Sequence, residues 1–227
     1  MDNNMLKLIY IYDPLCGWCY GAEPLLEIAA QHSSIQLELH AGGMLANDRK
    51  LLINDSFRQH IIQSDQRIAA ITGQPFTAAY RQMLSENNLA FDSAPPITAI
   101  LAAGKQSQQD FAMLKAIQHA HYVMGQRVSE NEILFSIATE IGLDKTQFIT
   151  NFNYFYGKPT QQHIDLSRDL LNRSGASGFP TLLIGSPSTD HLVSTDQRDE
   201  LQPIALADFL GDHSRWKKHL DQLSDHQ

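Results

Sequence analysis

The chain contains two cysteines, and both lie in one short segment, Asp13-Pro14-Leu15-Cys16-Gly17-Trp18-Cys19. Two thiols separated by two residues can close a small disulfide ring and can exchange that disulfide with another molecule. The segment follows an apolar run, Leu6 to Tyr12, and precedes apolar residues at helical spacing from Tyr20 to Gln31. The pair is therefore expected at a junction between a strand and a helix.

The predicted start of the helix gives the two sulfurs different roles. Cys16 is expected at the helix N-terminus, where unpaired N–H groups and the helix dipole stabilise a thiolate. Cys19 is expected one turn further in, where it is less exposed but still close enough to close the ring. We predict that Cys16 is an exposed sulfur that attacks a substrate and that Cys19 resolves the mixed disulfide.

Two other uses of a cysteine pair fit the sequence less well. A structural zinc site takes four ligands, usually two cysteine pairs or one pair with two histidines. The chain has no second cysteine pair, and His119-x-His121 lies far along the chain without the spacing of a zinc finger. Inert core cysteines are conceivable, but Gly17-Trp18 at a helix start is not ordinary core sequence. The sequence favours a redox centre whose chemistry needs no metal and no organic cofactor.

The composition narrows the range of partners. The chain has 227 residues, a hydrophobic content of 43% and a formal net charge of −8 at pH 7. Such an acidic chain is not expected to follow the phosphates of a nucleic acid. No apolar run approaches the roughly 18 residues that a membrane span requires, so no membrane partner is expected.

The first residues have neither the basic region nor the cleavage site of a secretory signal, so we expect a cytoplasmic protein. In that reducing compartment, a cysteine pair is expected to be catalytic or sensing rather than a stable structural disulfide.

The N-terminal pattern predicts a β-α-β unit. Leu6 to Tyr12 is apolar and rich in β-branched and aromatic residues, which is typical of a central strand buried on both faces. Ile35 to His40 alternates strictly and is expected nearer an edge of the sheet, before Gly42-Gly43 ends the pattern. The cysteine pair would then lie at the carboxyl end of the first strand, where open α/β sheets place their sites.

Residues 46–158 show helical patterns and no predicted strand. Ser107-x-x-Asp110 and Ser129-x-x-Glu132 both match the capping pattern of a helix start, and a loop is expected from Asn87 to Pro95. We therefore expect residues 46–158 to form an inserted helical subdomain.

The C-terminal part of the chain returns to strands. A helix is expected from Thr160 to Arg173 and a strand from Thr181 to Ile184, with His191 to Ser194 pairing back as a hairpin. A final helical region is expected to be interrupted at Gly211. The order β-α-β, helices, α-β-β-α predicts an α/β, thioredoxin-like fold built from residues 1–45 and 159–227.

The cysteine segment, the helical insertion and the late Gly178-Phe179-Pro180-Thr181 before a strand resemble the DsbA-like thioredoxin-fold oxidoreductases, FrnE-type cytosolic branch. The resemblance covers nearly the whole chain, and the two end motifs are its specific part. It implies that Cys16 is the nucleophile and Cys19 the resolving cysteine. It also implies that Pro180 is a cis-proline facing the dithiol and that the Phe179 backbone pairs with a bound substrate.

The sequence departs from the periplasmic branch of this family between its cysteines. Gly17 and Trp18 stand where that branch has proline and histidine, so no imidazolium lies beside Cys16 in the sequence. Stabilisation of a thiolate therefore depends mainly on the helix start.

The pair and the resemblance together predict a thiol–disulfide oxidoreductase. Its expected partners are disulfide-containing peptides or proteins, or a small thiol such as glutathione, whose disulfides it would reduce or rearrange. One alternative is a glutathione-dependent isomerase or transferase of the kappa type, although those relatives typically hold a serine where Cys16 stands. Another is a redox-regulated binding protein without enzymatic activity.

Further residues have two possible roles each. Trp18 is expected at the helix start, where it could cover a substrate thiol or pack against the insertion. Glu23, one turn beyond the motif, could relay a proton or be a solvated first-turn carboxylate. His119, His121 and Tyr122 share a predicted helix and could line a cleft under the insertion, although ordinary packing is the simpler interpretation.

Overall fold

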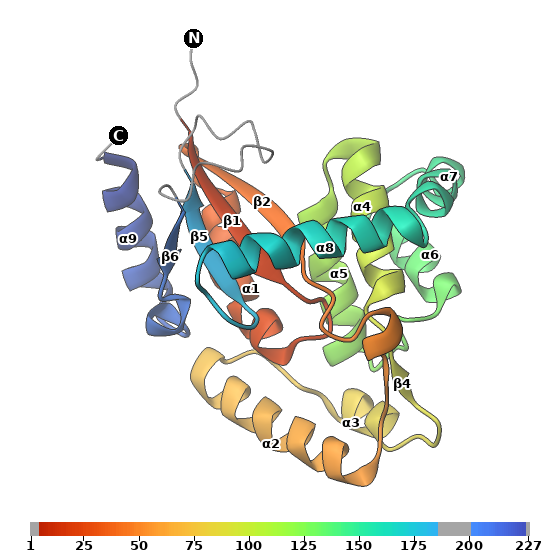
Figure 1. Ribbon diagram of the computed structural model, residues 1–227. Coiled ribbons are helices and arrows are strands. Elements are labelled where there is room, and N and C mark those ends of the chain that lie inside the picture. Colours follow the sequence, from red (N-terminus) through yellow and green to blue (C-terminus); the bar gives the residue numbers. More distant parts are fainter. Residues whose placement is uncertain (1–4, 186–200, 226–227) are drawn as a thin grey trace.

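A four-stranded sheet with the order β2-β1-β5-β6 lies at the centre of the molecule (Figure 1). The computed structural model describes residues 5–185 and 201–225. Its sheet consists of β1 (Leu6–Tyr12), β2 (Ile35–Ala41), β5 (Thr181–Gly185) and β6 (Gln202–Ile204). β2 runs parallel to β1, whereas the β1–β5 and β5–β6 pairs are antiparallel. The prediction of an inner first strand with a second strand at the edge is confirmed.

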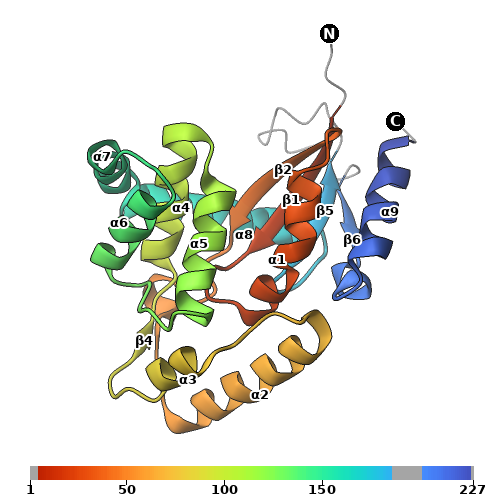
Figure 2. The same cartoon turned by 180° about the vertical axis from the view of Figure 1, so that it is seen from behind.

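Helices cover both faces of this sheet. Figure 1 shows α8 (Lys158–Arg173) in front of the strands, and Figure 2 shows α1 (Gly17–Ala30) and α9 (His213–Asp225) on the opposite face. A 3₁₀ helix, η2 (Leu206–Phe209), precedes α9.

Between β2 and α8 the chain forms a helical insertion. Its elements are η1 (Asn47–Arg49), β3 (Leu51–Leu52), α2 (Asp55–Thr72), α3 (Ala78–Leu84), β4 (Ala90–Phe91), α4 (Ala94–Ser107), α5 (Asp110–Tyr122), α6 (Asn131–Glu140) and α7 (Lys145–Phe155). None of the helices in residues 5–185 and 201–225 is long and apolar enough to cross a membrane.

The side chains of β1 are buried on both of its faces, which explains its uninterrupted apolar sequence. Tyr10 and Tyr12 belong to the large core that includes α1, and each is at most 1% exposed. Ile9 and Ile11 belong to a second cluster with Leu170 of α8. Because successive side chains of a strand point to opposite faces, one strand supplies both cores.

Helix α1 is tied to the insertion by a hydrogen bond that its own proline makes available. Pro24 lies inside α1 and has no backbone N–H, so the Tyr20 carbonyl lacks its usual helical donor. The side chain of Gln74 supplies that donor, with 3.0 Å between Nε2 and the carbonyl oxygen. On the other side, Trp216 of α9 donates from Nε1 to the Leu25 carbonyl at 2.7 Å.

Two glycines allow α2 to pack directly against the first turns of α1. A Cβ on Gly17 would lie 3.0 Å from Ile68 Cδ1, and a Cβ on Gly21 would lie 2.7 Å from Ile68 Cγ2. Residues four apart share one face of a helix, so Gly17 and Gly21, which have no side chains, together form one surface for α2. The insertion therefore reaches the residue that follows Cys16.

Three predictions about the insertion are wrong. The segment is not free of strands, because Leu51 and Leu52 of β3 pair with β4, and two-residue strands show no periodicity. The expected loop from Asn87 to Pro95 contains β4 and the start of α4. Ser107 ends α4 rather than capping the next helix, because Gln108 is left-handed (φ 55°) and Gln109 is the N-cap of α5.

Other boundaries also differ from the predictions. Glu130 rather than Ser129 is the N-cap of α6. The expected position of Cys16 at the start of α1 is confirmed, because the helix begins at Gly17 with Cys16 as its N-cap. The predicted hairpin strand from His191 to Ser194 lies outside the described residues. The division into 1–45 with 159–227 and 46–158 stays a prediction.

A buried carboxylate joins three parts of this fold. Asp13 follows β1 and is 0% exposed. Its Oδ1 accepts hydrogen bonds from Leu15 N at 2.8 Å and Ser93 Oγ at 2.9 Å, and its Oδ2 accepts from Met44 N at 2.5 Å. Burial raises the pKa of Asp13, and these hydrogen bonds oppose that rise. The cysteine segment, the chain after β2 and the start of α4 thus meet at one side chain.

We expect Asp13→Ala to lower the free energy of unfolding by about 2–4 kcal/mol, because two backbone N–H groups and one hydroxyl lose their buried acceptor. Urea denaturation at pH 7 measures this loss. Asp48→Ala, at an exposed position of η1, is the control and should change stability by less than about 0.5 kcal/mol. Equal stability of the two variants would contradict the joining role of Asp13.

Candidate functional site

The two cysteines lie at the start of α1 as free thiols. Cys16 is the N-cap residue and is 6% exposed, and Cys19 is 1% exposed. The expectation that Cys16 is exposed is wrong. The loop before β5 lies against this sulfur, with 3.7 Å between Cys16 Sγ and the carbonyl oxygen of Phe179.

Cys19 is the more deeply buried of the two thiols, and its surroundings favour the protonated form. Burial raises the pKa of the Cys19 thiol well above its usual range, and a hydrogen bond with the Cys16 side chain adds to the rise. Cys19 therefore stays protonated and can donate to the Cys16 sulfur. Beneath it, the Tyr10 hydroxyl donates to the Cys19 carbonyl at 3.2 Å. Burial also raises the pKa of Tyr10, so this neighbour is neutral.

The loop that faces Cys16 has the predicted backbone. The peptide bond between Phe179 and Pro180 is cis, which confirms the prediction. The Phe179 ring lies against the bare backbone of Gly42, where a Cβ would be 2.3 Å from Cε1 and Cζ of the ring. Only glycine leaves room for the ring at this position.

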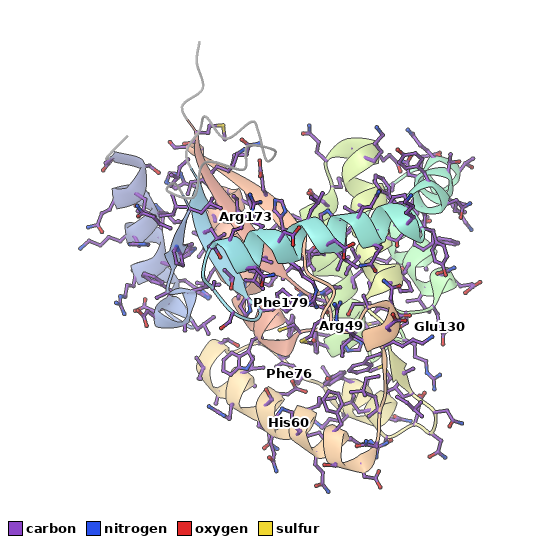
Figure 3. All side chains as sticks on the ribbon, viewed as in Figure 1. Arg49, His60, Phe76, Glu130, Arg173 and Phe179 are labelled. Carbon is purple, nitrogen blue, oxygen red and sulfur yellow. The ribbon has the colours of Figure 1, made fainter. Side chains whose placement is uncertain are left out.

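An arginine of α8 holds the same region. Arg168 Nε donates to the Gly42 carbonyl at 2.6 Å, and its Nη2 donates to the Gly43 carbonyl at 3.0 Å. Its guanidinium carbon lies 6.0 Å from the centre of the Phe179 ring. Burial lowers the pKa of Arg168, and the neighbouring charge of Arg49 lowers it further. Figure 3 labels Phe179, on the loop before β5, and Arg49, in η1.

An apolar groove begins beside the dithiol. It has a volume of about 420 Å³ and is lined by half-buried Trp18, by Pro180, and by Pro203 to Ala207 with Leu210. Most of its other lining residues come from β6, η2 and the residues beside them.

The three residues of α5 that could line a cleft do not share an open surface. His119 is exposed, whereas His121 is 2% and Tyr122 is 1% exposed. Burial lowers the pKa of His121 to about 4, so it is neutral at pH 7. Tyr122 stacks on Tyr20, with 4.5 Å between the ring centres. Packing accounts for His121 and Tyr122.

Glu23 connects α1 with the insertion. Its Oε2 accepts a hydrogen bond from Gln74 Nε2 at 3.1 Å, and its Oε1 lies 3.5 Å from Lys115 Nζ. Glu23 is therefore not a solvated carboxylate, and among the described residues its side chain contacts Gln74 and Lys115 rather than the two cysteines. A proton relay through Glu23 stays a prediction.

A second buried carboxylate, which was not predicted from the sequence, lies near the motif. Asp65 of α2 is 6% exposed, and its Oδ1 lies 3.0 Å from the place where a Cβ of Gly17 would be. Burial raises the pKa of Asp65 to about 7, and a hydrogen bond with Tyr80 opposes the rise. Asp65 stands four residues after Ile61 and three before Ile68, so it lies on the apolar face of the helix. An acidic residue on that face was the feature of the sequence that could have predicted its burial.

Comparison with known proteins agrees with this geometry. The model of the DSBA-like thioredoxin domain matches residues 7–203. A search of curated proteins found no match.

Several solved structures match nearly the whole chain. The chain is 38% identical to a structure described as the cytosolic disulfide reductase DsbM from Pseudomonas aeruginosa, with a TM-score of 0.85 and coverage of 98% of this chain and 100% of that one. A second structure of DsbM, with GSH, has a TM-score of 0.83, the same identity, and coverage of 96% and 98%. A candidate protein disulfide isomerase from Nitrosomonas europaea is 26% identical, with a TM-score of 0.73 and coverage of 98% and 100%.

More distant structures share the fold alone. The chain is 14% identical to a 2-hydroxychromene-2-carboxylate isomerase, with a TM-score of 0.59. The family match spans most of the chain, and the 38% identity to a disulfide reductase extends over almost its full length. The chain therefore belongs to the DsbA-like thioredoxin domain family, as a thiol–disulfide oxidoreductase with an intact Cys16–Cys19 pair.

Proposed function

We propose that this oxidoreductase is a cytoplasmic disulfide reductase in which Cys16 attacks the substrate and Cys19 resolves the intermediate. The observation that carries the proposal is the placement of the Cys16 sulfur. It lies at a helix N-terminus, 3.7 Å from the Phe179 carbonyl oxygen, with the protonated Cys19 thiol as its neighbour. The relative from Pseudomonas aeruginosa is described as a cytosolic disulfide reductase, which supports the same direction of electron flow and the same compartment.

The arrangement suits two consecutive exchange reactions. The Cys16 thiolate attacks one sulfur of the substrate, the substrate disulfide breaks, and the leaving thiolate takes up a proton. Cys19 then loses its proton and attacks Cys16 Sγ, which releases the second substrate thiol. The protein is oxidised by two electrons to the Cys16–Cys19 disulfide. Two molecules of a small thiol can return it to the dithiol and leave as one disulfide.

The loop and the groove suit an extended substrate. A chain that pairs with the Phe179 backbone would bind as an added strand, with its sulfur near Cys16. The groove lined by Trp18 and Pro180 would then receive an apolar side chain beside the cysteine of the substrate. Roles for these three residues are part of the proposal.

Glutathione is the small thiol that the site suits best. It carries two carboxylates, and two positive charges are available near the site. The Arg168 guanidinium lies 6.0 Å from the Phe179 ring, and Arg49 is near enough to Arg168 for its charge to lower the pKa of Arg168. Arg49 is exposed, and no ion pair of its side chain is found in residues 5–185 and 201–225. A DsbM structure is described as containing GSH, which supports the same ligand here.

Single serine variants distinguish the two cysteines. We expect Cys16→Ser and Cys19→Ser each to lose at least about a hundredfold in peptide-disulfide reduction, because each removes one of the two exchange steps. Mass spectrometry should detect a mixed disulfide with the substrate only in Cys19→Ser. Turnover by Cys16→Ser would overturn the assignment. Peptide binding by a wild-type protein that shows no reduction would favour a redox-regulated binding protein.

Replacement of Arg49 tests recognition of glutathione. We expect Arg49→Ala to raise the KM for glutathione about two- to fivefold, since an exposed charge pair contributes about 0.2–1 kcal/mol. Reduction by uncharged dithiothreitol should not change. Lys50→Ala is the matched control, because it removes an exposed positive charge from the next residue. Equal KM values for the two variants would contradict a carboxylate site at Arg49.

A further inference from the structure

Asp65 is a buried acid whose side chain is only partly satisfied by hydrogen bonds and forms no ion pair among the described residues. It lies on α2 and is 6% exposed. Its Oδ2 has no hydrogen-bond partner among the residues that the structure describes. Burying a carboxylate in this way costs stability unless its charge is paired. A side chain of this kind beside a reactive motif is a candidate for a functional role.

Asp65 lies against Gly17, the residue between Cys16 and Trp18 in the motif. Its Oδ1 lies 3.0 Å from the place of a Gly17 Cβ, and Gly17 directly follows Cys16. The buried Tyr122 of α5 is influenced by the charges of Cys16, Cys19 and Asp65 together, so these groups share one region. The contact depends on the absence of a side chain at Gly17.

The groups that face Asp65 from neighbouring elements do not neutralise it. Tyr80 of α3 offers a hydroxyl hydrogen bond, and burial raises the pKa of Tyr80 well above its usual range. His121 of α5, whose ring centre is 5.3 Å from that of Tyr80, is neutral at pH 7. Asp65, together with Tyr80 and Arg81 of α3, lines a small cavity of about 90 Å³. The Arg81 guanidinium is engaged elsewhere, because its Nη1 donates to the Phe76 carbonyl at 2.6 Å.

We propose that Asp65 acts through Cys16: its carboxylate disfavours the Cys16 thiolate and thereby makes the dithiol a stronger reductant. Two negative charges in the same buried region repel each other more strongly than they would in water. Stabilising the thiolate favours the reduced dithiol, so the disulfide form of the couple becomes a stronger oxidant, as in the strongest oxidants of this chemistry. Destabilising the thiolate has the opposite effect. The inference rests on the proposed function only in requiring that Cys16 and Cys19 form the redox couple.

The influence of Asp65 depends on pH. Because the pKa of Asp65 is raised to about 7, its carboxyl is mostly charged at pH 8 and mostly neutral at pH 5.5. The repulsion is therefore present at pH 8 and absent at pH 5.5. A residue that only filled space beside Gly17 would act equally at both values.

The test compares Asp65→Asn with the wild-type protein and with Asp55→Asn. The first variant keeps the size of the side chain and removes its charge. The second removes an exposed charge from the start of the same helix, where Asp55 pairs with Arg58. The oxidised fraction of the Cys16–Cys19 couple is measured in glutathione redox buffers, and the rate of Cys16 alkylation by iodoacetamide is measured in reduced protein, both at pH 8 and pH 5.5.

We expect Asp65→Asn to shift the exchange equilibrium with glutathione about tenfold toward the dithiol at pH 8, or about 30 mV for a two-electron couple. Cys16 should be alkylated severalfold faster at pH 8, and both quantities should stay within twofold of wild type at pH 5.5. Asp55→Asn should match wild type throughout. No shift at pH 8, a shift toward the disulfide, or equal shifts at both pH values would overturn the proposal.

A second variant keeps the proposal testable if Asp65→Asn does not fold. Tyr80→Phe removes the hydroxyl that favours the charged form of Asp65, so it should shift the equilibrium at pH 7 in the same direction by a smaller factor. Absence of this shift in folded protein would count against the proposal. If the wild-type cysteines form no disulfide in any buffer, the proposed function itself fails, whereas a normal couple without these shifts removes only the role of Asp65.

Discussion

The hydrogen bonds that Asp13 accepts are the constraint on which the site depends. One buried carboxylate binds the N–H of Leu15 in the cysteine segment, the N–H of Met44 after β2, and the hydroxyl of Ser93 at the start of α4. These segments are far apart in sequence, and one belongs to the helical insertion. Without this common acceptor, each would leave a polar group buried and unpaired. Asp13 thus fixes the start of α1, where Cys16 lies, relative to both the sheet and the insertion.

Positions without side chains bring the remaining groups to the sulfurs. Gly42 leaves room for the Phe179 ring, so the Phe179 carbonyl can reach Cys16. Gly17 leaves room for Asp65 and Ile68, so α2 can lie against the first turn of α1. The first contact builds the surface where a substrate would bind, and the second brings the Asp65 carboxyl against the residue that follows Cys16. The helical insertion therefore contributes to the electrostatics of the dithiol as well as to the core.

The features that follow local rules were predictable from the sequence. The apolar run of β1, the cysteine pair at a helix start and the glycines after β2 each have a local pattern, and the structure contains all three. The burial of Cys16 was not predictable, because its cover comes from Phe179, far along the chain. Asp65 was missed because one acid within an amphipathic helix is usually solvated. The two-residue strands β3 and β4 are too short to have a periodicity.

The reduction potential of the Cys16–Cys19 couple in the wild-type protein tests the central claim most directly. The site combines a helix N-terminus, which favours the Cys16 thiolate, with an unpaired buried carboxylate and no cation within the motif. This balance predicts a reducing couple, with a potential at pH 7 below about −200 mV and nearer to the −270 mV of thioredoxin than to the −120 mV of DsbA. Equilibration with glutathione buffers gives the value. A potential near −120 mV would contradict the account, because the protein would then act as an oxidant.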